Sequence, residues 1–93
     1  MMERPGRLLP WAGGEGKTCY LITDDPDGPM SRLADTTETV QLDMGARLLT
    51  HADALLPDTP PGDLRHLAEC LTGALRDALR IAESRGRRLE RWE

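Results

Sequence analysis

The sequence predicts a mainly α fold of the small α+β type, with an N-terminal β-hairpin followed by an antiparallel two-helix hairpin. Three observations carry this prediction. Two long segments repeat apolar residues with a helical period, a short Pro-rich segment separates them, and strand-forming residues flank a glycine cluster. The composition agrees, because hydrophobic residues make up 39% of the chain but aromatic residues only 3%, and Leu/Ala cores favour packed helices. We expect residues 1–93 to form a single domain.

The β-hairpin is predicted over residues 8–25, after a terminus (1–7) that we expect to be mobile. Three glycines within Gly13–Gly16 favour a turn, since glycine adopts positive φ without strain. Residues 18–23 that follow are typical of a strand. An isolated hairpin is marginal in water, so it should pack on the helices through Trp11 and the second strand.

The first long helix is predicted over residues 31–56, with Asp27 or Ser31 capping its N-terminus. Its apolar residues cover more of the circumference than the roughly 100° stripe that one neighbour requires. One stripe holds Leu33, Val40, Met44, Leu48 and Leu55, with His51 in its middle, and the adjacent arc holds Ala34, Leu42, Gly45, Leu49, Ala52 and Leu56. We therefore expect at least two neighbours: the second helix, and either the hairpin or another subunit. We interpret Gly45 as the position at which the two helices cross closely.

The second helix is predicted over residues 60–89 and has the cleanest amphipathic pattern in the chain. Thr59 is expected to cap it, with Pro60 in the first turn. The short connection makes the two helices antiparallel. Residues 90–93 form a tail.

Two helices alone make a thin core, so we expect a homodimer that completes a four-helix bundle. The predicted interface is the first stripe: Leu33, Val40, Met44, Leu48, His51 and Leu55. The alternative is a monomer whose N-terminal segment fills the open face.

Charge and cysteine content restrict the function classes. The net charge of -4 argues against a dedicated nucleic-acid surface, which is usually basic. Two cysteines far apart in sequence predict free thiols in a reducing cytoplasm. No stretch approaches the ~20 apolar residues that span a bilayer, so we expect a cytoplasmic protein without membrane contact.

Two motifs resemble ligand sites without meeting their requirements. Gly13–Thr18 ends in Gly-Lys-Thr like a phosphate-binding loop, but Trp11 stands where the pattern needs glycine, and the segment leads into a strand. Asp24, Asp25 and Asp27 do not follow the EF-hand spacing, so a turn is expected there.

Soft metal ligands are few. Cys19, His51, His66 and Cys70 could make a tetrahedral site, and the last two lie four apart on one helix, but no Cys-x-x-Cys pair is present. We expect no metal and no cofactor. His66 is predicted to be solvated, Cys70 half-buried, and His51 partly buried with one hydrogen-bond partner.

The C-terminal segment is rich in arginine. Arg85, Arg87, Arg88 and Arg91, together with Trp92, form a candidate partner-contact tail. It could contact nucleic acid, yet Glu83, Glu90 and Glu93 interrupt it, and cations are already favoured at a helix C-terminus. A solvated helix face is therefore the expected interpretation.

The chain resembles small proteins of GC-rich actinobacteria. The resemblance rests on the Arg/Ala/Leu/Asp bias and on stretches such as Cys19-Tyr20-Leu21, Ser31–Asp35 and Leu75–Arg80. It implies no catalytic residue, cofactor or fold.

The sequence favours a non-enzymatic protein-interaction or regulatory module that is homodimeric through the first helix. A further protein partner is left open. The alternatives are a nucleic-acid accessory protein that uses the arginine tail, and a small metal- or ligand-binding protein centred on His51 or on His66 and Cys70.

Overall fold

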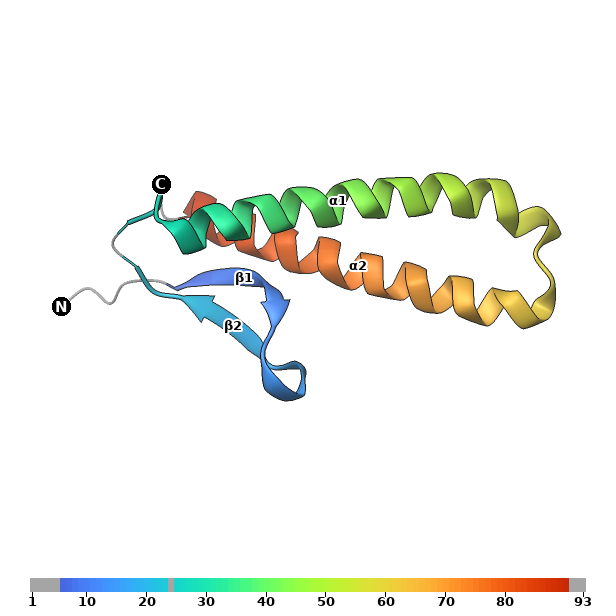
Figure 1. Cartoon of the computed structure of the whole chain (residues 1–93), viewed down its shortest axis with the longest axis horizontal. Coiled ribbons are helices and arrows are strands. Elements are labelled where there is room, and N and C mark those ends of the chain that lie inside the picture. Colours follow the sequence, from blue (N-terminus) through green and yellow to red (C-terminus); the bar gives the residue numbers. More distant parts are fainter. Residues whose placement is uncertain (1–5, 24, 91–93) are drawn as a thin grey trace.

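A computed structural model of the chain describes residues 6–23 and 25–90, and has the predicted order of elements (Figure 1). It is mainly helical, with a two-stranded antiparallel hairpin before two helices. The elements are β1 (Arg7–Ala12), a 3-10 turn (Gly14–Gly16), β2 (Thr18–Leu21), α1 (Pro29–Leu55), a second 3-10 turn (Leu56–Asp58) and α2 (Pro61–Glu90). The predictions made for residues 1–5, Asp24, Arg91 and Trp92 lie outside the described residues.

The helical pair has two unlike halves. The sheet lies beneath the first half of α1 and the last half of α2, whereas the other half consists of the two helices and their connection (Figure 1). We call the first half the sheet end (β1, β2, α1 29–41 and α2 80–90) and the second the loop end (α1 42–55, 56–60 and α2 61–79). The buried residues of the sheet end are Leu8, Leu9, Pro10, Ser31, Ala34, Glu38, Ile81 and Ser84. Among the described residues of the loop end, Ala52 is the one that is buried.

The strand β1 connects the sheet to both helices. Ser84 Oγ on α2 donates a hydrogen bond of 3.0 Å to the Leu8 carbonyl, and Gln41 Nε2 on α1 donates one of 2.7 Å to the Pro10 carbonyl. Leu9, which lies between Leu8 and Pro10, is buried as well. Docking was expected through Trp11 and either Tyr20 and Ile22 or Leu21. Trp11 and Leu21 are half-buried, whereas Ile22 is 66% exposed, so Ile22 does not take part in the docking.

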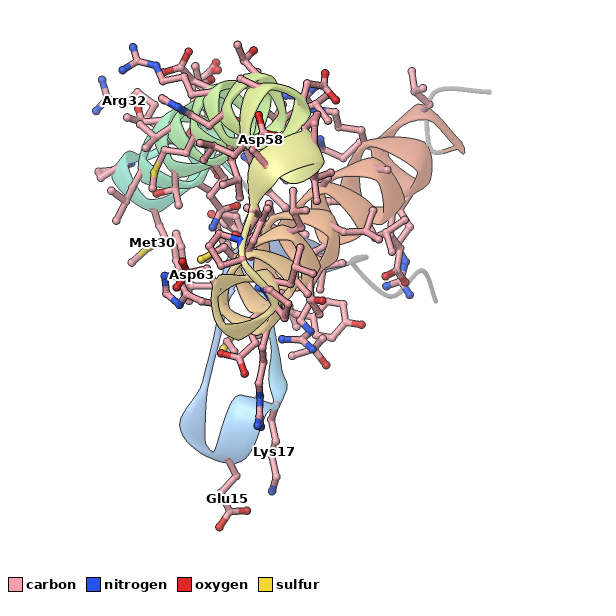
Figure 2. The ribbon with its side chains drawn as sticks, turned by 90° about the vertical axis from the view of Figure 1, so that its right-hand side faces the viewer. Glu15, Lys17, Met30, Arg32, Asp58 and Asp63 are labelled. Atoms are coloured by element: carbon pink, nitrogen blue, oxygen red, sulfur yellow. The ribbon has the colours of Figure 1, made fainter. Side chains whose placement is uncertain are left out.

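The turn between the strands needs left-handed backbone. Glu15 has φ 60° and Gly16 has φ 73°, which confirms a tight turn at the glycine cluster. Figure 2 shows Glu15 and Lys17 at its tip, pointing away from the helices.

The helix α1 begins two residues earlier than predicted. Gly28 is its N-cap and Pro29 its first residue, a position where the missing N–H of proline costs nothing. Ser31 lies inside the helix, is buried, and its carbonyl accepts a hydrogen bond of 3.1 Å from Arg7 Nη1. The prediction that Asp27 or Ser31 caps α1 is thus wrong.

The connection between the helices uses Thr59 differently from the prediction. Its hydroxyl donates to the Leu55 carbonyl and so caps the end of α1 instead of starting α2. The Pro60 carbonyl accepts the first hydrogen bonds of α2, from Asp63 N at 2.9 Å and Leu64 N at 3.2 Å.

A buried carboxylate ties the three layers of the sheet end together. The Glu38 side chain is 2% exposed and lies 3.2 Å from Arg7 Nη2, 3.4 Å from Arg88 Nη2 and 3.6 Å from Arg85 Nε. Arg7 belongs to β1 and the other two to α2. A buried charge is tolerated only when it is paired, so this network fixes how α1, α2 and β1 meet.

Candidate interaction surface

The loop end leaves large apolar side chains in solvent. Met44 and Leu49 on α1 are 63% and 58% exposed, and Leu75 and Leu79 on α2 are 60% and 61% exposed. No sheet lies over this half (Figure 1). Exposed apolar side chains gathered on one half of a chain are typical of a protein interface rather than of a finished monomer surface.

A first groove runs between the helices and is apolar on both walls. Its floor is formed by Gln41, Gly45 and Ala74, and its volume is about 430 Å³. The walls are Leu42, Ala46 and Leu49 from α1, and Leu71, Leu75 and Ala78 from α2. We call the surface formed by Leu42, Leu49, Leu71, Leu75 and Leu79 the leucine face; Leu79 joins it because residues four apart lie on one side of a helix.

A second groove shares this floor and opens on the other side of the line where the helices meet. Its volume is also about 430 Å³. Met44 and Leu48 form the α1 wall, but the α2 wall carries Glu69, Cys70, Gly73 and Asp77. One wall is therefore apolar and the other contains two carboxylates, so we call it the mixed groove.

The predicted interface stripe lies along the α1 side of the mixed groove. Leu33, Val40, Met44 and Leu55 are 52%, 49%, 63% and 54% exposed, Leu48 is half-buried, and His51 is exposed. The stripe therefore contributes little to the core of the single chain. The expectation that His51 is partly buried is wrong.

The glycine of α1 does not mark a close crossing. A Cβ built on Gly45 would meet no atom of another residue within 4 Å. Interpreting it as a helix contact is thus wrong; the residue instead deepens the floor of both grooves.

The described arginines of the predicted tail lie within α2 and have intramolecular partners. Arg85 and Arg88 face Glu38, and Arg88 Nη1 also donates to Ser84 Oγ at 2.7 Å. Arg87 contacts the Tyr20 ring, 5.5 Å from its centroid, and donates to the Tyr20 hydroxyl at 3.3 Å. The Tyr20 hydroxyl, with Glu83, raises the pKa of Arg87 above its ordinary value. These contacts join α2 to the sheet.

The candidate metal ligands are not gathered into a site. His66 Nε2 and Cys70 Sγ lie 3.7 Å apart on the exposed surface of α2, and Cys70 is half-buried as predicted. Within residues 6–23 and 25–90, no three His, Cys, Asp or Glu side chains are close enough to hold a metal ion together.

Two features escaped the sequence analysis. Glu38 was not singled out, because its partners lie 31, 47 and 50 residues away and local periodicity carries no trace of them. Leu75 and Leu79 lie within the amphipathic pattern of the second helix, but the predicted interface stripe contains neither of them. They lie two to nine residues before Ile81 and Ser84, which are buried, and the helical pattern gives no sign that the sheet stops short of them.

Comparisons with models of known protein families, with curated proteins and with solved structures each give no match. Among the described helices, none combines the length and the apolar character needed to cross a membrane.

Proposed function

We propose that this chain is a non-enzymatic protein-interaction module that acts as a homodimer, with α1 supplying much of the contact. The observation that supports this most is the loop end, where two helices without a third layer expose leucine and methionine on both sides of α1. Proteins bury such surface against a partner, since each Å² of apolar area removed from water is worth roughly 25 cal/mol.

The elongated shape of the chain supports the same proposal. Its radius of gyration is 16.5 Å, whereas a compact chain of 93 residues is expected near about 12 Å, and one of twice that length near about 16 Å. An elongated hairpin of this kind gains a second layer at low cost by pairing with its own copy, as helices in four-helix bundles do.

Light scattering on the purified chain over a concentration series tests the proposal. We expect a mass twice the 10.3 kDa of one chain. A mass of one chain at every concentration, together with the full helical signal in circular dichroism, would overturn it.

A further inference from the structure

We infer that the leucine face is the surface on which a second copy of this chain docks, with α1 of each copy lying against α2 of the other. The inference rests on the proposed function and names the side of the helical pair that forms the dimer. It places the contact on the leucine face rather than on the stripe beside the mixed groove.

The two sides differ in how much charge they would bury. On the leucine face both helices present leucine or alanine. Beside the mixed groove, α2 presents Glu69 and Asp77. Charged side chains are depleted from the centres of protein interfaces because their desolvation is costly, so the leucine face is the better centre.

The chain as a whole exposes more surface than a compact monomer of its mass would. The accessible surface of the chain is 7223 Å², whereas a compact monomer of 10.3 kDa exposes about 5,400 Å². The excess is roughly 1,800 Å², and a standard interface needs about 800 Å² from each partner.

Small residues in the floor and walls of the first groove explain how a copy would fit. Gly45, Ala46, Ala74 and Ala78 are small, and they lie between larger leucines on both walls. Since nothing lies within 4 Å of a Cβ built on Gly45, the space there is open within the single chain. A leucine of a second copy would enter this space as a knob enters a hole between helices.

Charged side chains of the loop end select the orientation. Four exposed charged side chains lie on the helices of the loop end: Asp43 and Asp53 on α1, the latter four residues after Leu49, and Arg65 and Arg76 on α2. The first groove pairs residues 41–49 of α1 with residues 71–78 of α2 in antiparallel order, so Asp43 lies near the level of Arg76, and Asp53 near that of Arg65.

A two-fold axis parallel to the helices leaves each residue of the second copy at the same height along the helix axis as in the first copy. It places Asp53 beside the partner's Arg65 and Asp43 beside the partner's Arg76. The other face-to-face arrangement, α1 against α1, would bring aspartates together and is disfavoured by like-charge repulsion. Within one chain, Asp43 pairs with Arg47 and Arg65 with Glu69; these exposed pairs, both four residues apart on a helix, are weak enough to exchange.

Two matched substitutions on the full chain test the choice of face. Leu75→Glu and Met44→Glu change side chains of nearly equal exposure, 60% and 63%, on opposite sides of the helical pair. We expect Leu75→Glu to raise the dimer dissociation constant in sedimentation equilibrium by about 30-fold or more, as loss of a central interface residue does. We expect Met44→Glu to change it by less than about threefold. Circular dichroism must show that both variants keep the wild-type helical signal.

A dimer that Met44→Glu disrupts and Leu75→Glu does not would overturn the choice of face and leave the homodimer intact. A wild-type chain that stays monomeric would overturn both. If Leu75→Glu loses helicity, the charge reversals Arg65→Asp and Asp53→Arg decide instead. Each alone should weaken the dimer severalfold, and the double variant should restore it; a double variant weaker than either single one contradicts the α1-to-α2 orientation.

Discussion

The sheet end and the loop end contain the same two helices but are held together differently. At the sheet end, β1 lies against both helices, and eight side chains are buried, among them Leu8 and Glu38. At the loop end, the helices have only each other, and Ala52 is the buried residue among those described. The difference indicates that amphipathic helices form readily but need a third layer before their leucines become a core.

The two ends also differ in the kind of interaction that holds their elements together. The sheet end is joined by hydrogen bonds and ion pairs between residues far apart in sequence, such as Ser84 with Leu8 and Arg7 with Glu38. Polar groups that pair in the interior fix one arrangement of the elements. The loop end offers mainly non-directional apolar surface, which suits association with another chain.

The largest effect is expected from removing the buried carboxylate. Glu38→Ala leaves Arg7, whose side chain is 11% exposed, without its buried partner. Breaking a buried ion pair costs about 3–5 kcal/mol, so we expect chemical denaturation to show a loss of that size or an unfolded chain.

Asp35→Ala is the matched control, because Asp35 pairs with the same arginine at 2.6 Å but is 63% exposed. An exposed ion pair is worth about 1 kcal/mol or less. Equal losses for the two variants would show that the burial of Glu38 is not what matters.

A smaller effect is expected from truncating the apolar residues of each end. Leu8→Ala empties a site that is 1% exposed and should cost about 2–5 kcal/mol. Leu49→Ala removes a side chain that is 58% exposed and should cost less than about 1 kcal/mol in a monomer. Both are measured in the Leu75→Glu background, so that contacts of the proposed dimer do not contribute. Similar costs would contradict the division into two ends.

The smallest effect is a gain in stability. Gly73 lies inside α2, and a Cβ at this position meets nothing within 4 Å. Gly73→Ala should therefore raise the free energy of unfolding by up to about 1 kcal/mol through helix propensity alone. Gly16→Ala is the opposite control, since its φ of 73° strains any L side chain. Thermal unfolding of the two variants should shift in opposite directions.

The sequence predicted the elements well because each is a local pattern. The helical period, the Pro-rich connection and the glycine cluster located α1, α2 and the hairpin to within a few residues. Caps were less predictable, because a threonine hydroxyl can either accept from the first N–H groups of a following helix or donate to the last carbonyls of a preceding one. The Thr59 hydroxyl donates to the Leu55 carbonyl of α1.

Which side of α1 faces the interior was not predictable from α1 alone. Its apolar band is wide, and which part faces α2 depends on where β1 docks. Ala34, Glu38 and Ala52 face the interior, although larger side chains such as Val40 and Met44 dominate the apolar pattern. Small residues and a carboxylate with distant partners give weak periodic signals, so the stripe chosen from the sequence consists mainly of side chains that the single chain leaves exposed.

Amide hydrogen exchange at two protein concentrations tests most directly whether a second copy completes the loop end. We expect protection of residues 42–55 and 61–79 to rise with concentration, while amides of β1 and of residues 80–90 that exchange by local opening change much less. Protection that is the same at both concentrations throughout α1 and α2 would contradict this account.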